Sequence, residues 1–257
     1  MIGGLDPSGC AGLALDVRVA HALGVHACPV ATTLTAQTPW RWHGDYAASP
    51  AAVRAQIDAA LASFRIGAVK IGMLGGAENT FAVAEAVREV GSELCVVLDP
   101  ILATSSGGAR VDDDGRAALL DALWPIAFVA TPNRPEAEAL AGMKITDEKS
   151  RDAVANRLLA AGAGNVVIKG GHDDGDESVD HWYDSATHRR LASPRRAGSP
   201  VRGTGCVFAS ALAAGLALGK SLADALVCAK DLVTRFVEDP LAAGPVGIGR
   251  VPIHAEA

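Results

Sequence analysis

Arg202–Gly219 reads RGTGCVFASALAAGLALG, a Gly-Thr-Gly turn followed by a long helix of small residues. Glycines on both sides of the threonine allow the backbone N–H groups of the turn to point outward. The N-terminus of the following helix carries partial positive charge, so the turn predicts a binding site for an anion such as phosphate. The same field would lower the pKa of the Cys206 thiol. The alternative is a glycine entry to a helix in which Cys206 is a small core residue.

The composition favours an α/β protein with close packing of helices on a sheet. The chain has 257 residues, of which 49% are apolar and 4% aromatic, so it can bury a large core. A net charge of −6 without a basic run argues against nucleic acid or an anionic membrane as the main partner. No apolar run has the length of a membrane span, and no stretch has the pattern of a secretory leader.

The cysteines indicate a reducing compartment. The chain has 5 of them, an odd number, and none are spaced as C-x-x-C. A disulfide framework or a zinc cluster is therefore not expected, and we predict a cytoplasmic protein whose thiols are mostly core residues.

Short apolar strands alternate with amphipathic helices along the chain. This alternation predicts a parallel sheet that is covered by helices on both faces. Strands are expected at 28–33, 68–71, 94–98, 126–130 and 166–169, with a two-stranded excursion within 181–191. Helices are expected at 11–23, 50–64, 78–90, 112–123, 135–141, 147–161, 207–218 and 222–237.

Polar and glycine-bearing segments follow these strands. They lie at 3–6, 70–73, 99–100, 131–133 and 169–171. Because ligands of parallel sheets bind at the carboxyl ends of the strands, we expect a site where these segments converge. One irregularity is the start of the chain, where Met1 and Ile2 leave little room for a strand before the expected turn at Gly3-Gly4. That first strand is expected to be a stub, or to continue from residues upstream.

Several side chains at this edge suit a nucleotide or a ring. Asn133 and Glu136 place an amide and a carboxylate three residues apart at a helix start, which suits Mg²⁺ held through water and equally an ordinary N-cap. Asp99 is a second carboxylate for a metal, and Lys169 suits a phosphate. Gln37, expected in a loop, can both donate to and accept from a heterocycle.

Together these segments resemble the ribokinase-like superfamily, and within it the hydroxymethylpyrimidine/phosphomethylpyrimidine kinases of thiamine biosynthesis. The resemblance is collinear over essentially the whole chain. Its pieces are DPSGCAG at 6–12, LTAQ at 34–37, VKIGML at 69–74, LDP at 98–100, TPNRPEAEAL at 131–140, VIKGGH at 167–172, SPR at 193–195 and GTGC at 203–206. Most ribokinase-like enzymes carry Asp where this chain has Cys206, so the cysteine indicates the pyrimidine-kinase branch.

The resemblance implies one kinase domain over residues 1–257, built as a three-layer α/β/α sandwich around a mostly parallel sheet. It implies a homodimer that uses ATP and Mg²⁺ to phosphorylate 4-amino-5-hydroxymethyl-2-methylpyrimidine and then its monophosphate. It implies that Cys206 is the general base, beside an anion hole. The implied site residues are Gly203, Thr204, Gly205 and Cys206 for catalysis, Gly4, Asp16, Gln37, Met73 and Ile101 for the acceptor, Asn133, Lys169 and Arg202 for ATP, and Glu136 and Asp99 for the metal.

Four features depart from the pattern of these kinases. Thr38 stands where Asn usually follows Gln37, Arg202 stands where His is common, and Val207 stands where Thr is usual. A Lys expected in the loop after Asp99-Pro100 is missing, and residues 104–106 read TSS there. These changes bear on substrate identity and efficiency more than on the fold. Two alternatives stay open: a pyridoxal kinase of the same branch, whose ring also bears a hydroxymethyl group, and a weakly active homologue with a binding or regulatory role.

Overall fold

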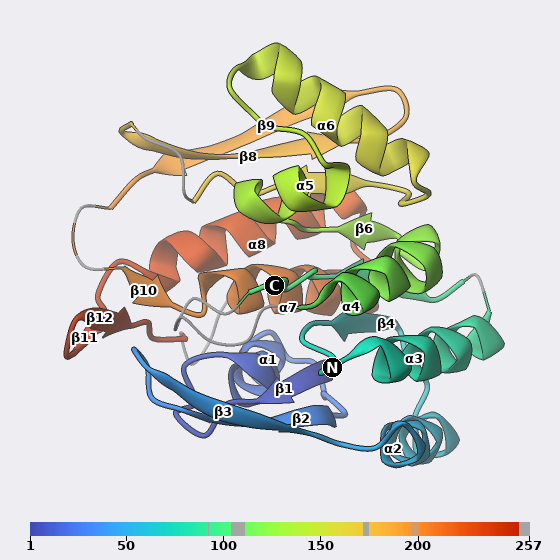
Figure 1. Ribbon diagram of the computed structural model, residues 1–257. Helices are drawn as coiled ribbons and strands as arrows, with labels where there is room; N and C mark the ends of the chain where they lie inside the picture. Colours follow the sequence, from blue (N-terminus) through green and yellow to red (C-terminus); the bar gives the residue numbers. More distant parts are fainter. Residues whose placement is uncertain (92, 104–110, 172–174, 197, 199, 252–257) are drawn as a thin grey trace.

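The structure is a computed structural model that describes residues 1–91, 93–103, 111–171, 175–196, 198 and 200–251. Within these residues a nine-stranded sheet has the order β3-β2-β1-β4-β5-β6-β7-β8-β9 (Figure 1). Its parallel part consists of β2 (Val30–Gln37), β1 (Ile2–Leu5), β4 (Ala68–Ile71), β5 (Cys95–Leu98), β6 (Val129–Ala130) and β7 (Val166–Ile168). Antiparallel strands close both edges, namely β3 (Trp42–Ala47) on one side and β8 (Glu177–Tyr183) with β9 (His188–Pro194) on the other.

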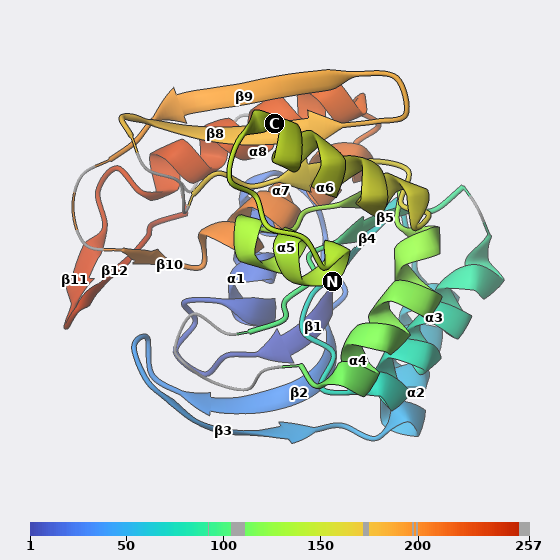
Figure 2. The ribbon, with the colours of Figure 1, turned by 45° about the horizontal axis from the view of Figure 1, so that its top comes forward.

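Helices pack on both faces of this sheet, as Figure 2 shows. One face carries α1 (Gly12–Ala22), α7 (Thr204–Ala217) and α8 (Leu222–Phe236). The other carries α2 (Pro50–Ser63), α3 (Ala77–Val90), α4 (Asp113–Ala118), α5 (Arg134–Ala141) and α6 (Glu148–Ala160). The predicted three-layer α/β/α sandwich with a mostly parallel sheet is confirmed.

The strands β5, β6 and β7 carry no charged side chain because each of them supplies both cores. In β5, Val97 belongs to the core under α7 and α8, whereas Val96 and Leu98 belong to the core on the opposite face. In β7, Val167 belongs to the core under α7 and α8, and Val166 belongs to the core on the opposite face. Alternate side chains of a strand point to opposite faces, so a strand covered on both sides needs no polar positions.

The start of the chain differs from the expectation. Gly3 and Gly4 lie inside β1 and not in a turn, and Ile2 pairs with both Val30 and Ile71. The expected strand at 28–33 is β2, which begins later and extends to Gln37. Gln37 is therefore a strand residue that pairs with Trp42 of β3. The edge strand β3 was not expected, because its sequence WHGDYA contains glycine and lacks a regular apolar alternation.

Two other segments also differ. The expected helix at 112–123 is divided into α4 and a π-helical turn at Leu119–Leu123. A 3-10 turn with a proline follows at Trp124–Ile126. The strand β6 therefore begins only at Val129 and not at 126 as expected. A small sheet in the order β10-β12-β11 was not expected, since its strands have two or three residues. They are β10 (Val201–Arg202), β11 (Leu241–Ala243) and β12 (Val246–Ile248). In the part of the chain that the structure describes, no helix combines the length and apolarity that a membrane crossing requires.

Candidate active site

The carboxyl ends of the parallel strands bring Asp99 and Lys169 together. Asp99 follows β5, Lys169 follows β7, and β6 lies between these strands. Lys169 Nζ lies 2.7 Å from Asp99 Oδ1, and the Thr131 hydroxyl donates to the same oxygen at 3.3 Å. Burial alone would lower the pKa of Lys169, but the carboxylates of Asp99 and Glu136 raise it above its ordinary value. Lys169 is therefore a protonated cation at the predicted edge.

Glu136 lies beside this pair in the first turn of α5. Its backbone N–H donates to Asn133 Oδ1 at 2.9 Å, and its Oε2 accepts the Asn133 N–H at 2.8 Å, so the N-cap is present as a capping box. Burial raises the pKa of Glu136 to about 7, Lys169 opposes this rise, and Asp99 adds to it. The Asp99 carboxylate is thus close enough to Glu136 to disfavour a charge on the Glu136 carboxyl. A divalent cation would relieve that repulsion, so the donor set fits Mg²⁺.

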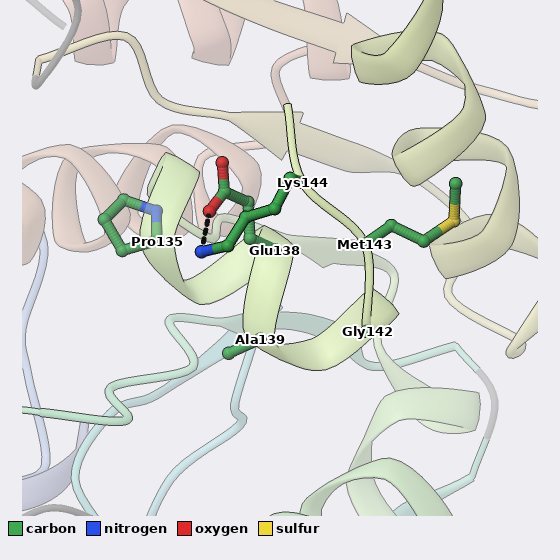
Figure 3. A pocket seen from close by; sticks show the side chains of 6 residues that line it. All are labelled: Pro135, Glu138, Ala139, Gly142, Met143 and Lys144. Carbon is green, nitrogen blue, oxygen red and sulfur yellow. Dashed lines mark hydrogen bonds and ion pairs between the residues drawn. The ribbon is translucent and has the colours of Figure 1, made fainter. Parts of the chain in front are cut away.

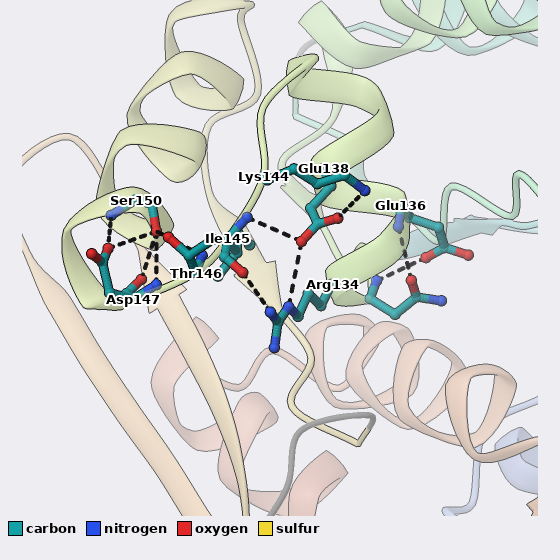
Figure 4. Close-up of polar contacts among 9 residues, drawn as sticks. Arg134, Glu136, Glu138, Lys144, Ile145, Thr146, Asp147 and Ser150 are labelled. Carbon is teal, nitrogen blue, oxygen red and sulfur yellow. Dashed lines mark hydrogen bonds and ion pairs between the residues drawn. The ribbon is translucent and has the colours of Figure 1, made fainter.

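A second polar network fixes the helix that carries Glu136. Figure 4 shows Arg134 donating to Glu138 and to the backbone carbonyl of Ile145. Glu138 Oε1 accepts the Ile145 N–H at 3.0 Å, and Glu138 Oε2 lies 2.7 Å from Lys144 Nζ. These contacts join α5 to the connection that leads to α6. The position of the Asn133–Glu136 turn is therefore set from both ends of α5.

The Gly-Thr-Gly segment is itself the start of α7, with Gly203 as the N-cap and Thr204 and Gly205 as the first helical residues, so this helix begins earlier than expected and lies against the same ion pair. Gly203 has a φ of +88°, and a Cβ there would lie 2.2 Å from the carbonyl oxygen of Cys10, so the position requires glycine. A Cβ at Gly205 would lie 3.3 Å from Lys169 Nζ and 3.8 Å from Asp99 Oδ2. The helix N-terminus, the cation and the carboxylate therefore share one place, where the helix N–H groups and the cation can bind phosphate groups.

Cys206 lies in the first turn of α7 with only 7% of its surface exposed. Burial raises the pKa of its thiol to about 11, Lys70 opposes this rise, and Asp16 and Asp99 add to it. The expected lowering of this pKa is therefore wrong. The sequence shows the helix N-terminus that would stabilise a thiolate, but it does not show the loss of solvent that destabilises one. At neutral pH Cys206 is a thiol.

Three residues predicted for the acceptor pocket lie along neighbouring strand ends. Gly4 is in β1, Met73 follows β4 and Ile101 follows β5. A Cβ at Gly4 would lie 3.4 Å from Met73 Sδ, and a Cβ at Gly72 would lie 3.6 Å from Ile101 Cδ1. The strands β1, β4 and β5 are consecutive in the sheet. These residues therefore form one continuous stretch of the edge, next to the start of α7.

Asp16 does not lie on the surface of this stretch. It is 0% exposed; its Oδ2 lies 2.7 Å from Lys70 Nζ, and its Oδ1 accepts a hydrogen bond from the Ser210 hydroxyl at 2.8 Å. We therefore correct its predicted role from pocket lining to buried partner of Lys70. Burial alone would lower the pKa of Lys70, but Asp16 raises it above its usual value. Sequence reasoning missed Lys70, whose one signal was a lysine inside the apolar run AVKI of β4.

Gln37 and Arg202, predicted for different ligands, are in contact. Arg202 Nη2 donates to Gln37 Oε1 at 2.8 Å, and Gln37 Nε2 donates to Thr35 Oγ1 at 3.0 Å. Arg202 is 7% exposed. Its guanidinium therefore lies on the acceptor side of the site, against β2, although it was predicted to bind ATP. The contact also fixes the orientation of the Gln37 amide.

Two cavities are lined by residues other than the predicted site residues. The cavity in Figure 3 has a volume of ≈ 330 Å³ and is lined by Pro135, Glu138, Ala139, Gly142, Met143 and Lys144. The other has a volume of ≈ 460 Å³ and is lined by Arg134, Glu148, Arg151, Glu177, Val179, His181 and Arg190. No predicted site residue lines either cavity. The candidate site is thus defined by the convergence of side chains at the sheet edge.

Comparison with known proteins shows the family to which this chain belongs. A sequence model of the phosphomethylpyrimidine kinase family matches residues 6–254. The thiamine biosynthesis bifunctional protein ThiED of Geobacter sulfurreducens is 38% identical over 98% of this chain, which spans 51% of that protein. The hydroxymethylpyrimidine/phosphomethylpyrimidine kinase of Rhizobium meliloti is 37% identical over 98% of this chain and 94% of its own length.

Solved structures show the same fold. Pyridoxal kinase of Bacillus subtilis, in a complex with ADP, has a TM-score of 0.88 at 29% identity and covers 97% of this chain and 95% of its own. Phosphomethylpyrimidine kinase of Clostridium difficile has a TM-score of 0.79 at 29% identity and covers 91% of this chain and 96% of its own. Because the family match extends over nearly the whole chain, this protein is a kinase that belongs to the phosphomethylpyrimidine kinase family.

Proposed function

We propose that this chain transfers the γ-phosphoryl group of ATP to the hydroxymethyl oxygen of 4-amino-5-hydroxymethyl-2-methylpyrimidine, and then to the phosphate so formed. The observation that carries the proposal is the meeting of Lys169 and Asp99 with the backbone of Gly205 at the start of α7. Phosphoryl transfer depends on alignment and on stabilisation of charge more than on covalent chemistry. A cation and helix N–H groups at one place supply both.

The nucleotide would lie on the Lys169 side of the site. Lys169 would bind the phosphates of the nucleotide, and Asn133 would also contact the nucleotide. Glu136 and Asp99 would hold Mg²⁺. Within the described ranges no three His, Cys, Asp or Glu side chains gather into a metal site, but Mg²⁺ keeps much of its water and needs only one or two carboxylates. Bound Mg²⁺ would neutralise charge on the transferring phosphoryl group.

The acceptor would lie on the side of Gly4, Met73 and Ile101, with the Gln37 amide at the ring. Cys206 would act as general base and remove the hydroxymethyl proton. A neutral thiol cannot accept a proton, so this step uses the small thiolate fraction that a pKa of about 11 allows. The second phosphorylation acts on a phosphate oxygen and needs no base. Cys206→Ala should therefore slow the first step more than the second.

Product identification by mass spectrometry tests the proposed function. The protein is incubated with ATP and Mg²⁺ and, in parallel, with the hydroxymethylpyrimidine, its monophosphate and pyridoxal. We expect the pyrimidine to gain one and then two phosphates. A clear preference for pyridoxal would overturn the substrate assignment.

A second candidate is a pyridoxal kinase, favoured by the structural similarity to the pyridoxal kinase of Bacillus subtilis. The sequence relatives favour the pyrimidine, so we place it second. Ligand binding without ADP formation would instead indicate the weakly active homologue. We also propose a single domain over residues 1–257, a homodimer and a cytoplasmic location; light scattering on a sizing column tests the dimer.

A further inference from the structure

The turn that follows Lys169 is held by charged side chains with no role in the site described above. Gly170 donates its backbone N–H to Asp180 Oδ1 at 2.9 Å. A Cβ at Gly170 would lie 1.9 Å from the carbonyl oxygen of Val179, so the backbone here lies directly against β8. The residue after Lys169 is thus fixed both by a hydrogen bond and by close packing.

The carboxylate that binds Gly170 belongs to a buried ion pair. Asp180 and Lys230 are 4% and 6% exposed, and Lys230 Nζ lies 2.9 Å from Asp180 Oδ2. Lys230 also donates to Ser178 Oγ at 3.2 Å. One oxygen of Asp180 therefore neutralises a lysine of α8, while the other binds the turn.

Arg195, in the SPR segment of the sequence, holds the same turn from its other side. Its Nη2 donates to the carbonyl oxygens of Gly170 at 3.0 Å and of Glu177 at 3.1 Å. Its Nη1 donates to the carbonyl oxygen of Gly171 at 2.9 Å, and its Nε donates to the carbonyl oxygen of Gly175 at 2.9 Å. Four guanidinium N–H groups thus bind carbonyls at both ends of the connection from β7 to β8. Residues 172–174 of this connection lie outside the described part of the chain.

Lys169 stands between two fixed points. On one side its backbone N–H donates to the carbonyl oxygen of Pro132 at 2.9 Å. On the other side Gly170 has its N–H bound by Asp180 and its carbonyl bound by Arg195. The lysine side chain then reaches Asp99 and the backbone of Gly205. A shift of the Gly170-Gly171 turn would move the lysine away from both.

We propose that Arg195 and Asp180 are positioning residues for nucleotide binding: by fixing the Gly170-Gly171 turn they hold Lys169 in the anion site. The inference rests on the proposed role of Lys169 toward ATP. It assigns no contact between Arg195 or Asp180 and the nucleotide itself. The planar fork of arginine is essential to it, because a lysine provides a point charge and cannot bind four carbonyls at once.

The test measures Kd by calorimetry for a Mg²⁺-bound, non-hydrolysable ATP analogue and, separately, for the hydroxymethylpyrimidine. Arg195→Ala and Arg195→Lys should each weaken binding of the analogue about tenfold and leave binding of the pyrimidine within about twofold. Arg196→Ala is the matched control, since the neighbouring Arg196 is exposed and pairs at the surface with Glu238. It should leave both constants unchanged.

Asp180 is tested by a pair of variants that separates its hydrogen bond from its charge. Asp180→Asn/Lys230→Met removes both charges but keeps an oxygen for the Gly170 N–H, and should bind the analogue within about twofold of the wild type. Asp180→Ala/Lys230→Met removes that oxygen as well and should bind it several-fold more weakly. Equal affinities in these two variants would contradict the role of Asp180.

An unchanged analogue affinity in Arg195→Ala would overturn the role of Arg195, and so would an equal loss for both ligands. Full rescue by Arg195→Lys would also overturn it, since that result would show that the charge of residue 195 matters and its fork does not. These binding results are independent of turnover. A failure of the proposed function appears instead as absence of phosphorylated product with the wild-type protein.

Discussion

Two lysine–aspartate pairs of equal length lie along the same sheet but in different surroundings. Lys70–Asp16 and Lys169–Asp99 are both 2.7 Å apart. The side chains of the first pair are 1% and 0% exposed, whereas those of the second are 13% and 3% exposed. The first pair is also held by Ser210 from α7, whereas the second lies beside Glu136 and the open backbone of Gly205.

The difference shows how one type of contact can serve two purposes. Lys70–Asp16 is enclosed, and together with Ser210 it ties β4 to α1 and α7. Lys169–Asp99 opens to the edge where phosphate and metal would bind, so a ligand could exchange for either partner. A ligand can replace one partner of this pair because separating two partly solvated charges costs less free energy than separating two fully buried ones. We therefore expect the first pair to govern stability and the second to govern turnover.

The largest expected effect is on the enclosed pair. Lys70→Met removes the cation and leaves the Asp16 carboxylate buried, which should lower the free energy of unfolding by about 3–5 kcal/mol. Urea denaturation measures this loss. Adding Asp16→Leu to the variant should recover part of it, because no unpaired charge is then buried. A loss under about 1 kcal/mol for Lys70→Met would show that this pair is not structural.

The open pair should respond in the opposite way. Lys169→Met should reduce kcat about 10²- to 10³-fold, the usual cost of removing one group that stabilises charge in a transition state. Its effect on urea denaturation should be smaller than that of Lys70→Met, the same substitution in the enclosed pair. If Lys169→Met keeps nearly full activity and is the less stable of the two variants, the comparison fails.

The sequence could predict the edge but not the enclosed pair. Purely apolar strands that end at Asp99 and Lys169 are enough to bring these residues together, because parallel strands end on one side. Asp16 and Lys70 are 54 residues apart, and nothing local shows that both lose all contact with water. Asp16 was therefore assigned to the pocket, and its buried partner Lys70 was not recognised.

The same limit applies to the pKa of Cys206 and to the contact that Arg202 makes. A helix N-terminus is visible in the motif at 203–206, but burial of the Cys206 thiol depends on packing by other segments. The contact between Arg202 and Gln37 joins residues 165 positions apart, through a strand, β10, of only two residues. Such short elements have no periodicity from which a contact can be predicted.

The pH dependence of the two phosphorylation steps tests the role of Cys206. Its raised pKa predicts that thiolate absorbance at 240 nm, taken as the difference between wild type and Cys206→Ala, has its midpoint near pH 11. If Cys206 is the base, the rate of the first phosphorylation should rise about tenfold per pH unit between pH 7 and 9, since the thiolate fraction grows at that rate below the pKa. The second phosphorylation should lack this slope. A thiolate midpoint below pH 8 would show that burial does not control this thiol.

The smallest expected effect concerns Arg202, and it shows whether this side chain affects binding of the pyrimidine or of ATP. Because Arg202 Nη2 orients the Gln37 amide, Arg202→Lys should raise KM for the pyrimidine about fivefold, as expected for loss of roughly 1 kcal/mol from one hydrogen bond. KM for ATP should stay the same. Arg202→His, which introduces the residue common in the family, serves as a second variant. A rise in KM for ATP alone would return Arg202 to the nucleotide side, because a guanidinium that only orients Gln37 has no means of changing affinity for ATP.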